Sequence, residues 1–137
     1  MFKNTTGYYN TSVGSESLYA NVSGVSNTAM GNFSLFSNSS GSLNTAIGMG
    51  SLLKLKSGSR NVALGYDAGR LDTLGNNNVY IGTGSGSSST PSDRFSRDGS
   101  IFIGNNSGTL ETRSNRLYIE NSVQKPHLST ETLKKTA

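Results

Sequence analysis

The five-residue stretch NTAIG at residues 44–48 has near copies at equal distances on both sides. The chain reads NTAMG at residues 27–31, seventeen residues earlier, and NVALG at residues 61–65, seventeen residues later. NTSVG from Asn10 and NVYIG from Asn78 continue the same interval, so five motifs share one spacing. Such fixed-period self-similarity is typical of a solenoid, in which each unit buries its apolar face only against its neighbours.

The motif has the pattern of a short β-strand. Thr45 and Ile47 fall on one face and Ala46 on the other, because side chains alternate along a strand. Glycine follows each strand, and a second glycine column three residues before each Asn predicts another corner. SLF at 34–36 and SLL at 51–53 suggest a second short strand or strand-like stretch in the repeat. The residues predicted to form a stacked apolar ladder are Val13, Met30, Ile47, Leu64, Ile81, Ile103 and Ile119.

The other face of the predicted strand carries small residues in the first repeats and aromatic residues in the later ones. A small residue at a repeated position indicates close approach, and the change to an aromatic residue indicates more space towards the C-terminus. A single chain this thin offers no second layer to cover that face. We therefore expect a homotrimeric fibre, side by side or intertwined, that buries it. The residues predicted to face the trimer are Ala29, Ala46, Ala63, Tyr80, Phe102 and Tyr118.

The composition supports a thin, regular β-structure. Of the 137 residues only 32% are hydrophobic and 17 are glycine, which is poor material for a thick core. The net charge of +4 comes from scattered basic residues, so we expect no nucleic-acid partner. There is no cysteine and no apolar stretch near the roughly 20 residues of a membrane helix. We therefore expect neither disulfides nor insertion into a membrane.

The repeat divides the chain into five segments. The regular 17-residue repeats break at a Ser- and Gly-rich stretch, and the last strand-like triplets, IFI and LYI, follow it at a different spacing. The predicted segments are a lead-in at 1–6, regular β-repeats at 7–84, an insertion loop at 85–100, irregular last β-repeats at 101–121 and a polar tail at 122–137. The fold class is therefore all-β, a parallel β-solenoid or β-roll.

The stretches GSLNTAIGMGSL and GSRNVALGYDAG resemble the head repeats of trimeric autotransporter adhesins. They are still more similar to the repeat regions of bacteriophage and large-virus tail fibres, and SNRLYIENS is similar to the exit from such repeats. The resemblance covers about residues 7–121. It implies a parallel trimer of rod-shaped β-solenoids that serves attachment, placed on a virion as a tail fibre or at a cell surface.

The sequence offers little for catalysis. The one histidine, His127, lies in the tail, and nothing in the sequence orients it as part of a catalytic triad. GTGSGS at 82–87 lacks the Lys and Ser/Thr of a phosphate-binding loop. The acidic residues are dispersed and lack calcium-loop spacing, although two carboxylates could meet across a subunit boundary as a glycosidase pair. We predict no catalytic residue, metal site or cofactor.

Aromatic residues near the repeat corners are the better functional lead. Aromatic rings on a polar Asn- and Ser-rich background suit stacking on sugars and contacts with proteins, although they could also plug the corners. We therefore expect a rod segment of a tail fibre or adhesin that binds a cell-surface glycan or protein receptor. A self-assembling extracellular filament and a glycan-cleaving tail spike are the alternatives. The candidate contact residues are Tyr19, Phe33, Phe36, Tyr66 and Phe95.

Overall fold

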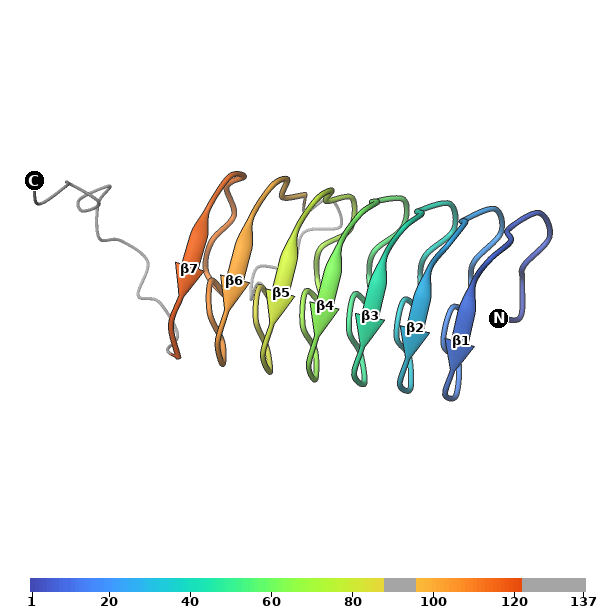
Figure 1. Ribbon diagram of the computed structural model, residues 1–137, viewed down its shortest axis with the longest axis horizontal. Coiled ribbons are helices and arrows are strands. Elements are labelled where there is room, and N and C mark those ends of the chain that lie inside the picture. Colours follow the sequence, from blue (N-terminus) through green and yellow to red (C-terminus); the bar gives the residue numbers. More distant parts are fainter. Residues whose placement is uncertain (88–95, 122–137) are drawn as a thin grey trace, which may run out of the picture.

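The computed structural model is an all-β parallel solenoid and describes residues 1–87 and 96–121 (Figure 1). Among these residues there is no helix, and each turn contributes one three-residue strand to a single sheet along the rod. The strands are Thr11–Val13 (β1), Thr28–Met30 (β2), Thr45–Ile47 (β3), Val62–Leu64 (β4), Val79–Ile81 (β5), Ile101–Ile103 (β6) and Leu117–Ile119 (β7).

The strands pair in sequence order, each parallel to the next. The register confirms the 17-residue period, because Thr28 lies opposite Thr45 and equivalent residues stay aligned from β1 to β5. Val79 lies opposite Ile101, which is 22 residues on, and Ile101 opposite Leu117, which is 16 residues on. The irregular spacing thus leaves the sheet in register, although half of the predicted insertion, 88–95, lies outside the described residues, as does the predicted tail at 122–137.

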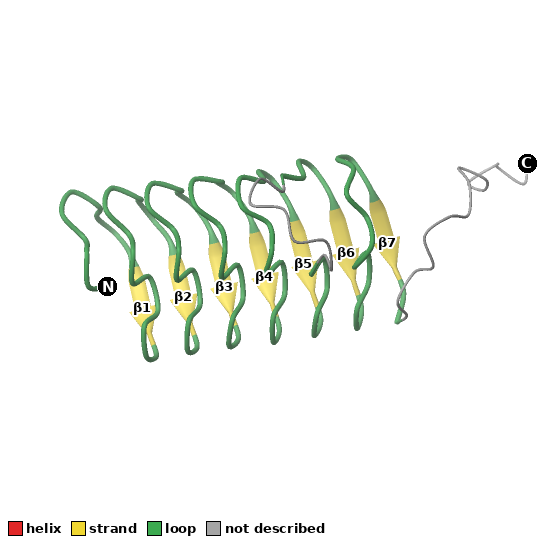
Figure 2. Ribbon diagram, turned by 180° about the vertical axis from the view of Figure 1, so that it is seen from behind, coloured by secondary structure: helices red, strands yellow, loops and turns green. Residues whose placement is uncertain are grey.

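The back of each turn is a loop, not the second strand predicted at SLF and SLL (Figure 2). Leu35 and Leu52 have φ angles of 50° and 49°, in the left-handed region that no extended strand visits. The backbone of this segment still bonds from turn to turn, as in the 3.0 Å bond that the Leu35 N–H donates to the Ser51 carbonyl. A tight left-handed turn therefore replaces the predicted strand and directs the leucine side chain into the interior.

The two glycine columns serve different physical needs. Gly48, which follows β3, has a φ of 129°, so it ends the strand in a conformation that L side chains rarely adopt. Gly41 has no such φ, but a Cβ there would overlap the carbonyl oxygen of Gly58 in the next turn. The second column was predicted as a corner for conformational reasons, whereas the structure requires it because successive turns approach closely.

A buried asparagine ladder runs along the rod beside the strands. The Asn44 side-chain amide donates to Asn27 Oδ1 at 3.1 Å and to the Gly58 carbonyl at 2.8 Å. Asn44 Oδ1 in turn accepts bonds of 3.0 Å from both the backbone and the side-chain nitrogen of Asn61. Each turn is thereby joined to the next by side-chain bonds in addition to the backbone bonds. The ladder consists of Asn10, Asn27, Asn44, Asn61 and Asn78.

The face predicted to pack against sister chains is the interior of the single chain, so that prediction is wrong. The middle residue of each strand points inward, and five of the six residues named have no exposed surface in one copy. Only Tyr118, in the last turn, is partly exposed. The turn closes upon itself, so the loop at its back covers the strand and supplies the second layer that we expected only from other copies. The fully buried residues are Ala29, Ala46, Ala63, Tyr80 and Phe102.

At two interior positions of the repeat, a small strand residue accompanies a leucine and an aromatic strand residue accompanies a glycine, except in β4, where Ala63 accompanies Gly69. Where β3 carries Ala46, the residue six positions later is Leu52, and both are fully buried. Where β5 carries Tyr80, the residue six positions later is Gly86, and a Cβ there would overlap the tyrosine ring. The aromatic side chains therefore fit because a leucine is absent from the same cross-section, and no space from a partner is needed.

We expect the Asn44→Ala substitution to lower the free energy of unfolding by about 3–5 kcal/mol, because it leaves buried polar groups of Asn61 and Gly58 without partners. Denaturant titration followed by circular dichroism measures the change. Asn32→Ala is the matched control, because exposed Asn32 accepts one surface bond, from the Ser15 N–H at 3.2 Å, and should cost less than about 1 kcal/mol. Equal losses in the two variants would show that the ladder adds nothing beyond a surface bond.

Candidate interaction surfaces

The outer face of the sheet carries the predicted apolar ladder. The register aligns its seven residues from turn to turn, as predicted. The ladder is not buried in the single chain, because Val13 is 53% exposed, Met30 41% and Ile47 40%. Large aliphatic side chains in a continuous row at the surface are unusual for an isolated soluble rod and mark a surface that contacts something else.

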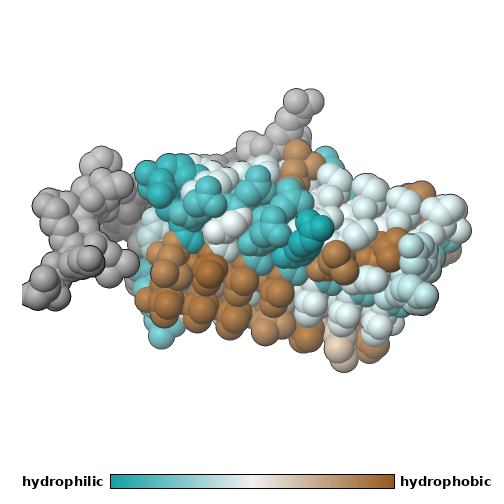
Figure 3. Space-filling view, turned by 45° about the horizontal axis from the view of Figure 1, so that its top comes forward, coloured by the Kyte–Doolittle hydropathy of each residue, from teal (hydrophilic) through white to brown (hydrophobic). Residues whose placement is uncertain are grey.

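A second apolar column joins the ladder in the C-terminal half of the sheet. The first residue of each strand also points outward, and it is threonine in β1–β3. In β4–β7 the same position is aliphatic, so each of these four turns presents two aliphatic side chains. Figure 3 shows the result as a continuous brown band over the C-terminal half of the sheet, which becomes pale and broken towards the N-terminus. The second column consists of Val62, Val79, Ile101 and Leu117.

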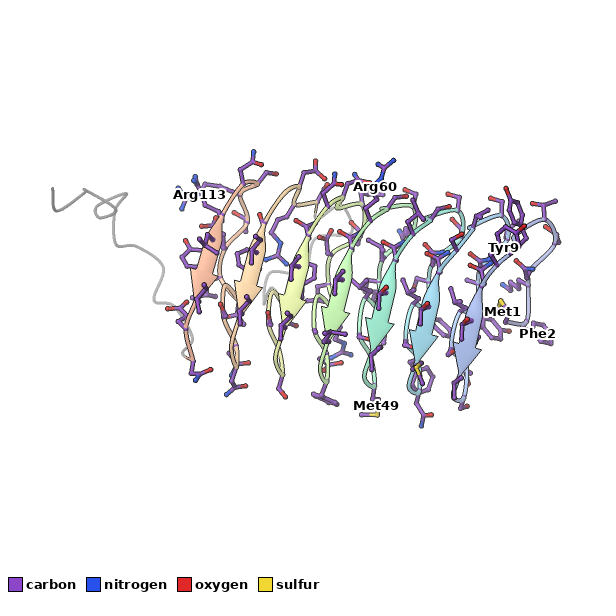
Figure 4. The ribbon with its side chains drawn as sticks, in the orientation of Figure 1. Met1, Phe2, Tyr9, Met49, Arg60 and Arg113 are labelled. Carbon is purple, nitrogen blue, oxygen red and sulfur yellow. The ribbon has the colours of Figure 1, made fainter. Side chains whose placement is uncertain are left out.

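Charged residues flank the outer face without interrupting it. Neither column contains a charged residue in any of the seven strands. Arg60 and Arg113 extend from one long edge of the rod, and Met49 lies on the opposite edge (Figure 4). The face therefore has charged residues along one edge, as at the rim of an interface, and an exposed methionine at the other.

Two of the predicted contact residues, Tyr19 and Phe36, form part of an aromatic stack at the back of the rod. Tyr19 stacks on Phe36 with ring centroids 5.2 Å apart and planes 12° apart, and Phe2 stacks on its other side at 5.3 Å. The ring faces of Tyr19 are thus occupied by neighbouring rings, so its edge is what remains for solvent. This arrangement favours the alternative in which these rings cover the corner over stacking of sugars on them.

The other three predicted contact residues are Phe33, Tyr66 and Phe95. Phe33 meets the same stack edge-on, with its ring 5.9 Å from that of Phe36, and is 39% exposed. Tyr66 is 48% exposed on the turn that follows β4. Phe95 lies outside the described residues. Of the four described residues, the structure brings Tyr19, Phe33 and Phe36 together and leaves Tyr66 on another turn, and the role of all five in contacts stays a prediction.

The interior contains a buried acid next to a buried tyrosine. The Tyr80 hydroxyl donates to Asp72 Oδ2 at 2.6 Å, and the Gly75 N–H donates to Asp72 Oδ1 at 2.9 Å. Burial raises the pKa of the Asp72 carboxyl, although the Tyr80 hydrogen bond and the Arg97 charge oppose the rise. Burial and the Asp72 charge raise the pKa of Tyr80 well above its usual value. Tyr80 thus remains a donor that holds the strand to the corner of the preceding turn.

Arg97 is fully buried beside this pair, at the position where earlier turns have glycine. Its guanidinium donates to the carbonyl oxygens of Glu111, at 3.1 Å, and of Gly86. It also lies 5.3 Å from the ring centroid of Tyr80 and 4.9 Å from that of Phe102. Arg97 therefore joins carbonyls of two segments, around Gly86 and around Glu111, where the repeat spacing changes.

Glu111 forms the second acid–tyrosine pair. The Tyr118 hydroxyl donates to Glu111 Oε2 at 2.8 Å, and Arg113 Nε and Nη2 donate to the two carboxylate oxygens at 2.9 Å. Burial alone would raise the pKa of Glu111, but the hydrogen bonds from Arg113 and Tyr118 outweigh it and lower the pKa to about 2. In both pairs the acid precedes the strand tyrosine by seven or eight residues, so the sequence contained this signal.

The described residues hold no cluster of three or more His, Cys, Asp or Glu side chains that could bind a metal ion. His127 lies outside them. The two buried acids, Asp72 and Glu111, are each engaged by a tyrosine hydroxyl. No helix capable of spanning a membrane is found in the described part of the chain.

Comparisons of the chain with protein families, with curated proteins and with solved structures find no match.

Sequence reasoning missed the three buried ionisable residues and the second aliphatic column. The column was visible as the change from Thr to Val, Ile or Leu at the residue after each motif Asn. Arg97 could have been found only by noticing that arginine stands at a glycine position of the repeat.

We expect Arg97→Met to lower the free energy of unfolding by about 3–5 kcal/mol, because it leaves buried carbonyls unbonded and the Asp72 charge uncompensated. Arg97→Lys keeps the charge and should cost less. The double variant with Asp72→Asn should lose less than the sum of the single losses. Chemical denaturation measures all four, and additive losses would show that the two side chains do not interact.

We expect Glu111→Gln to flatten the acid limb of the stability curve. The folded-state pKa of about 2 lies below the usual 4.5, so this carboxylate contributes stability above pH 4.5 that is lost as the pH falls towards 2. The contribution at neutral pH is roughly 1 kcal/mol after screening of the exposed Arg113 is allowed for. Thermal melts across pH 2–7 test this against Glu16→Gln at an exposed corner. Parallel acid limbs for Glu111→Gln and the parent would contradict it.

Proposed function

We propose that this chain is a rod segment of an attachment fibre, either a virion tail fibre or a surface adhesin, in which three copies assemble side by side. The single observation that carries the proposal is the uncharged outer face of the sheet, on which one apolar row follows the whole rod and a second row joins it on β4–β7. A fibre built from several parallel copies covers such a face, and a single soluble rod leaves it in water.

Several features support a mechanical and display role. Backbone hydrogen bonds join every turn to the next, and the asparagine ladder adds side-chain bonds from Asn10 to Asn78, which favours a stiff rod. Exposed aromatic residues such as Tyr66 lie away from the sheet face, at positions that stay accessible when copies pack through it. Three copies of a weak contact site, held at fixed distances by the rod, would raise the avidity for a cell-surface glycan or protein.

The interior chemistry supports a structural role more than hydrolysis of glycans. Asp72 has no exposed surface and Glu111 is held by two arginine nitrogens, so neither carboxylate is placed to reach a sugar ring. A glycosidase needs two accessible carboxyl groups on either side of the bond that it cleaves.

We expect sedimentation equilibrium of the purified chain to give three times the 14.4 kDa monomer mass over a wide concentration range. Far-ultraviolet circular dichroism of the same sample should show β-structure. A folded monomer at every concentration would overturn the fibre proposal. A mass that grows steadily with concentration would favour the filament alternative over a discrete trimer.

A further inference from the structure

The aliphatic patch on β4–β7 is the candidate surface for self-association, and the outward residues around it decide whether the rods pack parallel or antiparallel. The patch is defined here as the eight outward side chains of these strands, Val62, Leu64, Val79, Ile81, Ile101, Ile103, Leu117 and Ile119. We propose that further copies of this chain dock on this patch with their rod axes parallel and their turns in register. The inference rests on the proposed fibre function and deepens it.

The patch fits another copy because its spacing is that of the solenoid itself. Its rows repeat at the distance between hydrogen-bonded strands, about 4.8 Å. A surface with the same rows at the same spacing is present on every other copy, so ridges of one sheet can enter the grooves of the next. The apolar ladder and the second column lie side by side on the face. The ladder of one copy can therefore pack on the second column of its neighbour around an axis parallel to the rod.

The area of the patch is at the lower limit of what a contact between copies needs. At roughly 60 Å² of exposed apolar surface for each of eight side chains, one copy presents on the order of 500 Å². Two copies would bury about 1,000 Å² in total, which is at the lower limit for a stable interface. Three copies would bury the same area per copy, so that about 1,500 Å² in total would be shared among three contacts.

The parallel direction follows from the residues that continue the face towards the N-terminus. Val13, Met30 and Ile47 are 40% exposed or more and extend the ladder beyond the patch. When the rods run in the same direction, these residues face each other and are covered together with the patch. When the rods run in opposite directions with their patches overlapping, β1–β3 of each copy project past the partner and stay exposed. Parallel packing therefore buries more apolar surface.

The register follows from the boundary of the patch. In β3 the outward residues are Thr45 and Ile47, and in β4 they are Val62 and Leu64. A shift by one turn would place aliphatic residues of one copy against the threonine column of the next. Only the unshifted arrangement matches all four fully aliphatic turns with each other.

The first experiment compares the oligomeric state of two charge variants. Ile81→Asp places a carboxylate in the middle of the patch but on a side chain that points out of the fold, so each chain should remain folded. We expect its association constant to fall at least 100-fold, giving monomers at micromolar concentration. Val22→Asp is the matched control, because Val22 is a 42% exposed aliphatic residue outside the strands, and it should keep the mass of the parent. Circular dichroism verifies the fold of both.

The second experiment measures the direction. The chain has no cysteine, so Ser15→Cys places a single nitroxide label near the N-terminal end of the rod. Parallel, in-register packing predicts label distances close to the width of the assembly. Antiparallel packing over the patches separates the labels by about nine turn spacings along the axis, or roughly 40 Å. Distances from double electron–electron resonance distinguish the two.

The outcomes separate this inference from the fibre proposal. A monomeric parent overturns both. A trimeric parent whose mass is unchanged by Ile81→Asp leaves the fibre standing and overturns the patch as its interface. Loss of association in Ile81→Asp but not in Val22→Asp, with short Ser15→Cys label distances, supports the inference, whereas long label distances in that case overturn the parallel register.

Discussion

The turns of this solenoid stack at the fixed spacing of paired strands, and the rest of the structure depends on that constraint. The strand residue and the corner residue six positions later share the interior, so Ala46 accompanies Leu52 and Tyr80 accompanies Gly86. In the turn of β4 both residues are small, and Leu52 and Tyr80 of the neighbouring turns lie beside Gly69. A rod whose turns must stack at this spacing cannot swell where a larger residue enters, so size is exchanged within a turn or between neighbouring turns.

The interior is polar because the rod is narrow. A turn of 17 residues cannot build a core from aliphatic side chains alone, so asparagine, serine, acid and arginine side chains occupy much of it. Each of these groups would be costly if unpaired, and the repeat supplies partners at every turn. Asn44 bonds to the equivalent residues above and below, while Arg97 bonds carbonyls where the regular spacing is lost.

The division between inside and outside determines how the rod can act. The closed turn buries the alanine and aromatic column, so surface recognition is left to the other side of the strands and to the corners. The outer side is aliphatic and uncharged, which suits packing of identical rods, whereas the corners carry exposed rings and charges such as Tyr66 and Arg60. Assembly and attachment, as proposed, would thus use different surfaces of one repeat.

The sequence by itself determined the period, the strand positions, the parallel register and the alternation that places Thr45 and Ile47 opposite Ala46. These follow from local rules, because identical residues at a constant interval must occupy equivalent positions in successive turns. Only the tertiary structure decided which side of the strand is the interior, because that depends on how the back of the turn closes. The left-handed turn at Leu35 and Leu52 closes the back of the turn. A leucine repeated at a fixed interval gives no indication of such φ angles.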